Sequence, residues 1–204
     1  MSSYMVVAGV SDALRQVLWQ ELFDDLETRQ FFLSNQDIVF LNPTETARNT
    51  ANNLSLWLYQ VTENEYVKNQ PMIRSNGADS LSYTPLAINL NYLITPFAHV
   101  ANGDSAARDE DHMVLGKVMQ IFHDNSIIYI SDTVNDIHEE LRIIFKHMSL
   151  EELTRVWEAL REPYRLSVCY EVRVTRIDSN RIQQNARVIE RAADHGEVPS
   201  SATG

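Results

Sequence analysis

The sequence predicts an α+β fold: a mixed β-sheet of about four to six strands flanked by three main helices, with an extended C-terminal arm. Three observations predict this class. Apolar residues recur at helical spacing in three stretches, shorter strand-like apolar runs lie between them, and 204 residues are enough to bury one core. We therefore expect a single α+β domain over residues 1–178, followed by an arm and a disordered tail over residues 179–204.

The N-terminal part predicts a helix and then a short strand. The helix spans residues 4–24, where the apolar stripe consists of Val7, Val10, Leu14, Val17, Leu18 and Leu22. Residues 36–43 predict a short strand closed by Asn42 and Pro43, and residues 44–53 predict a polar loop or connector.

Two longer strands are expected next. Residues 54–61 are apolar on both faces, which is typical of a strand covered on both sides and central in a sheet. Residues 62–84 are polar and predict an extended excursion or loop, and residues 85–97 predict a strand bracketed by Pro85 and Pro96. The expected faces are Leu54, Leu56 and Leu58 against Trp57, Tyr59 and Val61 in the first strand, and Leu86, Ile88 and Leu90 against Asn89 and Asn91 in the second.

A second helix is expected over residues 108–123. Residues 109–111 place acidic side chains in its expected first turn, where the helix dipole favours them. The expected apolar face consists of Leu115, Met119 and Phe122. Residues 126–131 are expected to be extended, and residues 140–148 to form a strand with Leu141, Ile143 and Phe145 inward.

The best specified unit is a helix, a stop and a strand over residues 149–174, with the sequence SLEELTRVWEALREPYRLSVCYEVRV. Ser149 and Glu152 match a capping box, and Pro163 is expected to end the helix. The expected helix stripe is Leu150, Leu153, Trp157 and Leu160. The expected core residues of the strand are Leu166, Val168, Tyr170, Val172 and Val174, with Ser167, Cys169, Glu171, Arg173 and Thr175 facing outward.

Composition argues against several classes of function. The net charge of -11 argues against a nucleic-acid backbone as the main partner. Cys169 is the only cysteine, so neither an intramolecular disulfide nor a cysteine-based zinc site can form, which fits a reducing compartment. We expect no signal peptide, and no apolar run reaches the roughly 20 residues that span a bilayer.

A search for catalytic or metal-binding groups returns no candidate. Residues 109–112, Asp-Glu-Asp-His, have side chains of the types that bind metals. Consecutive residues point in different directions around a helix, however, so they cannot all face one ion. Nothing in the sequence places Cys169 beside His147 as a nucleophile and base, and a lone strand cysteine usually packs inertly. We therefore expect no enzyme, no cofactor, no metal and no catalytic residue.

Three blocks of the sequence resemble one family. They are LSLWLYQVTENEYVKNQP at residues 54–71, PLAINLNYLITPFA at residues 85–98 with EDHMVLGKVMQIFHD at residues 110–124, and the helix–stop–strand unit at residues 148–179. Together they resemble the cap, or tail-terminator, proteins of phage-tail-like contractile injection systems of the virulence-cassette and antifeeding-prophage type. The resemblance covers roughly residues 7–179. Its most specific part is the third block, with a Leu-Glu-Glu-Leu helix, Trp157, and then Pro163 to Ser167 entering a strand.

The resemblance implies a structural role. Such a protein would form a ring, expected to be six-fold, on the distal end of the inner tube and sheath, and would stop their polymerisation. Expected partners are further copies of the chain and the tube and sheath proteins, without nucleic acid or membrane insertion. Assembly is expected in the cytoplasm, within a particle that can be released from the cell.

The resemblance also suggests interface residues. Residues 179–193 are the candidate arm, which could add a missing strand to the last sheath layer. The candidate protein-interface residues are Tyr164, Arg165, Arg187, Val188, Ile189 and Arg191. The competing interpretation is a small acidic adaptor or assembly chaperone that joins no particle. A weaker third interpretation is an enzyme whose site is assembled from distant residues.

Overall fold

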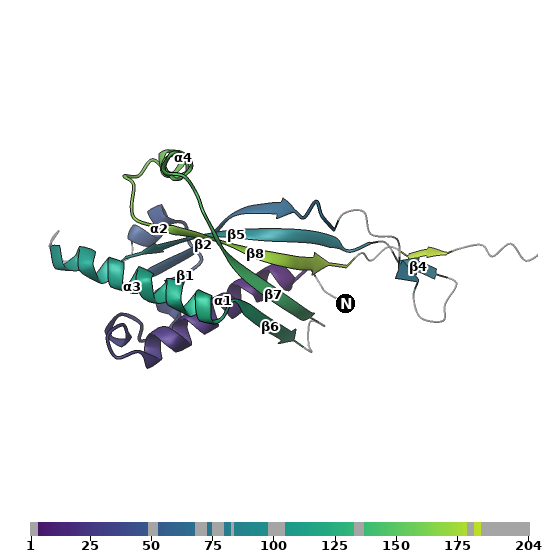
Figure 1. Cartoon of the computed structure of the whole chain (residues 1–204), viewed down its shortest axis with the longest axis horizontal. Coiled ribbons are helices and arrows are strands. Elements are labelled where there is room, and N and C mark those ends of the chain that lie inside the picture. The colour runs from purple at the N-terminus through teal and green to yellow at the C-terminus, as the bar shows by residue number, and fades with distance from the viewer. Residues whose placement is uncertain are drawn as a thin grey trace, which may run out of the picture.

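A mixed six-stranded sheet forms the centre of the molecule, in the order β1-β2-β5-β8-β7-β6 (Figure 1). The computed structural model describes residues 4–48, 53–67, 73–74, 80–82, 84–97, 105–132, 137–178 and 182–184. The six strands are β1 (Ile38–Val39), β2 (Leu54–Glu63), β5 (Leu86–Pro96), β6 (Ile127–Asp132), β7 (Ile137–Lys146) and β8 (Val168–Ile177). β1 is parallel to β2 and the other neighbours are antiparallel, so the predicted α+β class with a mixed sheet is confirmed.

Two long helices, α1 (Val6–Asp24) and α3 (Ser105–Asp124), lie together on one face of this sheet (Figure 1). The face of α1 that meets the sheet repeats every four residues and is fully buried: Val6, Val10, Leu14, Leu18 and Leu22. α3 contributes Val114, Val118, Ile121 and Phe122 to the same core, and the strands contribute Leu54, Leu56, Leu90, Tyr92, Ile94, Leu141 and Val172. The helix predicted over residues 4–24 is confirmed, and its stripe is the largest helical contribution to the core.

The turn after α1 is held by one carboxylate. Asp25 Oδ1 accepts hydrogen bonds from the backbone N–H groups of Glu27 and Thr28, each at 3.1 Å. Asp25 Oδ2 lies 3.0 Å from Lys117 Nζ on α3. The Lys117 ammonium and the N–H of Thr28 lower the pKa of Asp25 below its usual value. This carboxylate therefore ties the end of α1 to α3.

One irregularity in the central strands changes the expected faces. β2 shifts register against β5 between Leu58 and Gln60, so Val61 lies opposite the core residue Leu90. Residues directly opposite each other share a face of the sheet. Val61 therefore lies on the opposite face from Trp57, whereas the alternation predicted that the two would share a face. It is also half-exposed, at 51%. A β-bulge adds one residue to a strand and reverses the alternation beyond it, which a simple period of two does not capture.

The region before β2 was predicted only in part. Residues 35–37 form a 3₁₀ turn and only Ile38–Val39 is strand, while Pro43–Ala47 forms a short helix, α2, within the expected connector. Asn42 Oδ1 accepts a hydrogen bond from Glu45 N at 2.9 Å, and Pro43 occupies the first helical position. This is a helix start, because proline lacks a donor that the first turn would leave unpaired in any case.

α3 begins at Ser105, three residues earlier than expected. Residues 109–111 therefore lie beyond the first turn, and the expected dipole contact does not form there. The buried face is Val114, Leu115, Val118, Ile121 and Phe122, while Met119 is 39% exposed, so the expected face was partly wrong.

α4 (Leu150–Leu160) lies on the other side of the sheet from α1 and α3 (Figure 1). The capping box is confirmed: Glu152 N donates to Ser149 Oγ at 3.3 Å, and Ser149 N donates to Glu152 Oε2 at 2.8 Å. The helix ends before Pro163 in a Schellman motif, where Arg161 adopts the left-handed conformation with φ 56°. Of the expected stripe, Trp157 is 2% exposed, whereas Leu150 is 68% exposed.

β8 follows the turn and lies inside the sheet, between β5 and β7. Val168 is partly buried, and Tyr170 and Val172 are buried as expected, but Leu166 precedes the strand and is 44% exposed. Cys169, Ser167 and Glu171 were expected to face outward, yet all three are buried. They lie on the face away from α1 and α3, and that face is itself covered near α2 and α4.

A second, three-stranded sheet lies beyond the ends of β5 and β8 (Figure 1). It has the order β3-β4-β9 and consists of β3 (Ile73–Arg74), β4 (Ser80–Ser82) and β9 (Ile182–Gln184). Part of the expected excursion is therefore strand, and residues 182–184 of the candidate arm pair antiparallel with β4. The remaining arm residues and the predicted disordered tail lie outside the described residues.

Trp157→Ala should lower the free energy of unfolding by about 3–5 kcal/mol, because the indole is almost fully buried and its removal leaves a cavity. Urea denaturation followed by circular dichroism would measure this. Leu150→Ala on the exposed part of the same helix is the control and should change stability by less than about 1 kcal/mol. Equal effects of the two substitutions would show that α4 packs differently.

Asp25→Asn should reduce the loss of stability in acid. A carboxylate whose pKa is lowered by folding stabilises the native state above its unfolded pKa of about 4, and this contribution is lost as pH falls through the folded pKa. The wild-type protein should therefore lose more stability than the variant between pH 7 and acid below about pH 4. Parallel denaturation curves for both proteins across that range would contradict the assigned contacts.

Candidate protein interface

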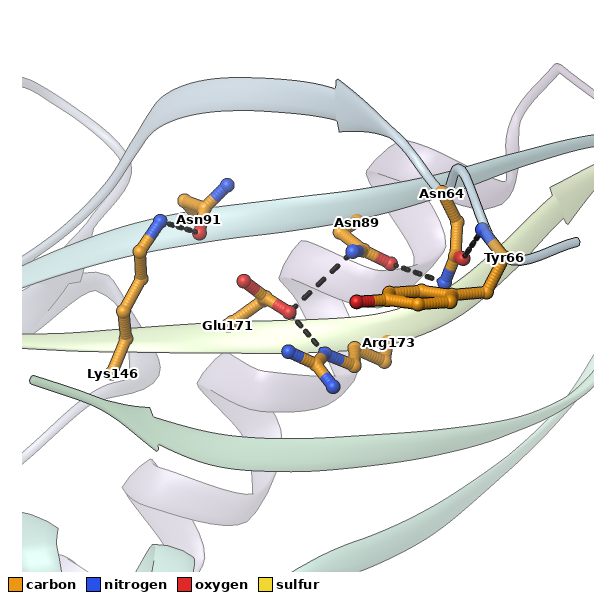
Figure 2. Close-up of polar contacts among 7 residues, drawn as sticks. All are labelled: Asn64, Tyr66, Asn89, Asn91, Lys146, Glu171 and Arg173. Carbon is orange, nitrogen blue, oxygen red and sulfur yellow. Dashed lines mark hydrogen bonds and ion pairs between the residues drawn. The ribbon is translucent and has the colours of Figure 1, made fainter. Parts of the chain in front are cut away.

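A row of polar side chains crosses the sheet on the face away from α1 and α3 (Figure 2). We call it the polar row and define it as Asn64, Asn89, Asn91, Lys146, Glu171 and Arg173. Its members come from the end of β2 and from β5, β7 and β8. Side chains so far apart in the sequence meet because these strands are neighbours in the sheet.

Glu171 is at the centre of the polar row. It is 9% exposed and lies opposite Asn91 on β5 and Ile144 on β7. Its Oε1 accepts a hydrogen bond from Asn89 Nδ2 at 3.4 Å and forms an ion pair with Arg173 Nε (Figure 2). A buried carboxylate needs such partners, because an unpaired buried charge is costly.

Asn91 is the most buried member of the polar row, at 0% exposed. Lys146 Nζ donates to its Oδ1 at 2.9 Å (Figure 2). Its Nδ2 is buried and has no hydrogen-bond partner among the residues that the structure describes. The lysine thus covers one end of the asparagine, and the polar row is closed off from solvent at this point.

The other end of the polar row carries an exposed aromatic ring. Asn64 Nδ2 donates to Asn89 Oδ1 at 3.1 Å, and Tyr66 N donates to Asn64 Oδ1 at 3.1 Å. These contacts fix the turn after β2, and Figure 2 shows the Tyr66 side chain directed back along the polar row. Tyr66 is 97% exposed. A tyrosine held on an ordered turn supplies contact area at low entropic cost, which is typical of protein interfaces.

The turn between α4 and β8 forms a second exposed surface. The Tyr164 ring meets Trp157 edge-on, with centroids 6.2 Å apart, and Tyr164 remains 44% exposed. The Arg165 guanidinium lies 5.0 Å from the centre of the Phe97 ring at the end of β5. Both predicted interface residues are therefore exposed side by side at one corner, anchored by buried aromatic rings.

A groove opens between the end of α3 and the strands β7 and β8. Its volume is about 410 Å³, and its walls include Met119, Phe122, Phe145 and Tyr170. The Tyr170 ring contacts Phe122 and Phe145 edge-on, at centroid distances of 4.9 and 5.5 Å, and burial raises the pKa of Tyr170 to about 12. Phe145, expected to point inward, is 50% exposed at the mouth of this groove.

The described residues contain no arrangement suited to nucleophilic or metal chemistry. Cys169 Sγ lies 3.2 Å from Tyr59 Oη, and burial raises the pKa values of both the thiol and the phenol. A thiol that burial keeps protonated is a poor nucleophile. Within the described ranges no group of three or more His, Cys, Asp or Glu residues could hold a metal ion, and none of the helices there is both long and apolar enough to cross a membrane.

The predicted interface residues divide into two groups. The structure brings Tyr164 and Arg165 together, whereas Arg187, Val188, Ile189 and Arg191 lie outside the described residues. Sequence reasoning missed Asn64, Tyr66 and Lys146. The spacing Asn64–Glu65–Tyr66 was the available signal, because asparagine commonly accepts a hydrogen bond from the N–H two residues later.

Comparisons with known proteins identify similar chains. A family model described as the Pvc16 N-terminal domain matches residues 9–191. The PVC sheath/tube terminator, from the extended state of an extracellular contractile injection system, is similar with a TM-score of 0.62 and 18% sequence identity, over 100% of this chain and 67% of that chain. The tube-terminating cap of the anti-feeding prophage has a TM-score of 0.46 and 19% identity, over 68% of this chain and 48% of that chain. The comparison with curated proteins finds no match.

Arg173→Met should lower the free energy of unfolding by about 1–2 kcal/mol, because Glu171 stays buried and loses its charged donor while Arg173 itself is partly exposed. Arg142→Met is the matched control. Its partner Glu140 is 41% exposed, so this substitution should lower the free energy of unfolding by less than about 1 kcal/mol. Chemical denaturation of both variants would compare them. A larger effect at Arg142 would mean that Glu171 does not depend on Arg173.

Proposed function

The chain belongs to the Pvc16 N-terminal domain family, and from that premise we propose that it is a structural cap, or tail terminator, of a contractile injection system. Six copies form a ring on the distal end of the inner tube and sheath, end polymerisation and anchor the sheath. The similarity of fold to the PVC sheath/tube terminator over the whole of this chain carries the proposal.

The differing surfaces of the subunit support a cap. A growing tube ends in an interface that would accept another ring. A closed ring built from head-to-tail contacts can match that interface on one side and present another surface on the other. Here one face of the sheet is covered by α1 and α3, and the other carries the polar row and the Tyr164–Arg165 corner. The protein acts by shape, without a catalytic step.

The proposed partners are other copies of the chain, the inner tube and the sheath. Tyr164, Arg165, Arg187, Val188, Ile189 and Arg191 are the proposed interface residues within the particle. A net charge of -11 disfavours nucleic acid as a partner. Assembly takes place in the cytoplasm, without membrane insertion, and the particle that carries the cap can be released.

Imaging particles assembled with and without the chain tests this function. Without it, tubes should show a broader length distribution and sheaths should detach, since nothing closes their distal end. The double variant Tyr164→Ala/Arg165→Ala should weaken capping if the corner contacts the particle, with Arg155→Ala, whose side chain is 74% exposed, as the control. Unchanged tube lengths in the absence of the chain would reject the cap, and a monomer that never associates with particles would support the adaptor.

A further inference from the structure

Strand β6 is the last strand of the main sheet in the part of the chain that the structure describes. Among the described residues only β7 pairs with it, because β6 stands last in the strand order. The opposite edge, β1, has two residues and is followed closely by Pro43. Natural sheets protect edge strands with short length, lysine, proline or bulges. Residues 127–132, Ile-Ile-Tyr-Ile-Ser-Asp, contain neither proline nor lysine and pair in unbroken register with β7.

One hydrogen bond shows which groups of β6 point outward. Ile143 N donates to Ser126 O at 2.8 Å, while Ile127 lies opposite Arg142. In an antiparallel pair the bonded positions alternate, so Ile128 and Ile130 direct their backbone groups toward β7. Ile127 and Tyr129 direct theirs toward the free edge. Their side chains are 48% and 74% exposed.

The apolar groove adjoins this edge. Ser126 directly precedes β6 and lines the groove together with Met119, Ile143 and Phe145. A strand laid along β6 could therefore make backbone hydrogen bonds to the edge and place an apolar side chain near the groove. Edge and groove together fit an extended peptide with apolar residues at its centre.

The chain itself contains such a peptide. Residues 185–191 are Asn-Ala-Arg-Val-Ile-Glu-Arg, with Val188 and Ile189 in the middle. They follow β9, which lies at the tip of the molecule and points away from the main sheet (Figure 1). In a strand, Arg187, Ile189 and Arg191 would share one face. They suit the face of Tyr129, whose ring attracts arginine, and of its cross-strand neighbour Glu140, a carboxylate that already pairs with Arg142 and has a second oxygen to offer.

We propose that residues 185–191 of one copy add a strand to the β6 edge of the next copy. The inference rests on the proposed ring and names its subunit contact. Donor and acceptor are different parts of one chain, so a contact repeated in one direction from each copy to the next is head-to-tail and can close a ring. Pairing of β6 with β6 would be two-fold and would give both sides of an assembly the same surface. The resemblance implied the sheath as recipient of this arm, whereas the proposed recipient here is the β6 edge of the next copy.

Sedimentation velocity of full-length variants tests the contact. Tyr129→Pro removes an outward N–H without breaking the β6–β7 ladder, and Tyr129→Val is its control because it keeps the N–H. Val188→Asp/Ile189→Asp blocks the donor. Each blocked variant should self-associate at least about tenfold more weakly than wild type, as expected for the loss of hydrogen bonds and apolar contact. Tyr129→Val should remain close to wild type.

Mixing the two blocked variants is the decisive measurement. One keeps the donor and the other keeps the edge, so the mixture should form a two-chain complex that neither forms alone. A mixture that stays monomeric would overturn the proposal in favour of pairing within one chain. Dimers of the donor-blocked variant alone would show β6–β6 pairing, and a monomeric wild type would also overturn the contact. If the melting temperature of Tyr129→Pro is well below that of Tyr129→Val, Ile127→Pro is used as the edge-blocked variant instead.

Imaging of particles made with each variant separates this inference from the cap function. If both blocked variants assemble like wild type and tube lengths stay controlled, the contact is wrong and the cap stands. If the variants lose self-association and tube lengths do not change, the cap function fails. Loss of sheath binding with self-association intact would assign residues 185–191 to the sheath and overturn the contact.

Discussion

The burial of α1 and α3 against one face of the sheet is the interaction on which the rest of the structure depends. The five α1 residues of the stripe from Val6 to Leu22 are at most 1% exposed, and they cover strands that are far apart in the sequence. This packing fills one face only. The other face is covered near α2 and α4. Away from these helices, the buried polar side chains of the sheet must hydrogen-bond to one another. The polar row meets this requirement by pairing Glu171 with Arg173 and Asn91 with Lys146.

The same asymmetry connects the fold to assembly. A subunit with an apolar, helix-covered side and a polar, open side has no equivalent surfaces to offer a neighbour. A head-to-tail contact, as in the proposed ring, joins two different surfaces of the subunit and so fits this asymmetry. The Tyr164 ring packs on Trp157, so its position is partly fixed before any partner arrives, whereas at Tyr66 the hydrogen bond to Asn64 holds the backbone of the turn.

The sequence predicted the elements with strong periodicity and missed those defined by single contacts. The α1 stripe, the capping box at Ser149 and the strands β2, β5 and β8 follow from spacing alone. The bulge at Leu58–Gln60 did not, because an extra residue in a strand is fixed by pairing with a distant strand. The start of α2 at Asn42–Pro43 was visible but was interpreted as a turn. Leu166 was placed in the core because it continues the alternation, yet the strand begins two residues later.

The candidate interface was less predictable than the fold. Tyr164 stood out at a helix-to-strand turn, but Glu171 and Cys169 looked exposed when they are buried. Burial on the second face depends on where α2 and α4 lie, and no local pattern encodes that position. The polar row depends in the same way on the strand order, since Lys146 and Asn91 are 55 residues apart in the sequence.

The position of β8 has a mechanical consequence. The chain runs from β8 directly into β9, so a pull on residues beyond Gln184 is transmitted through the backbone to β8. β8 is flanked by β5 and β7, and its hydrogen bonds lie across the direction of such a pull. They would be loaded together in shear instead of being unzipped one at a time. The C-terminal end of β8 is therefore suited to bear the tension that a contracting assembly would apply in the proposed particle.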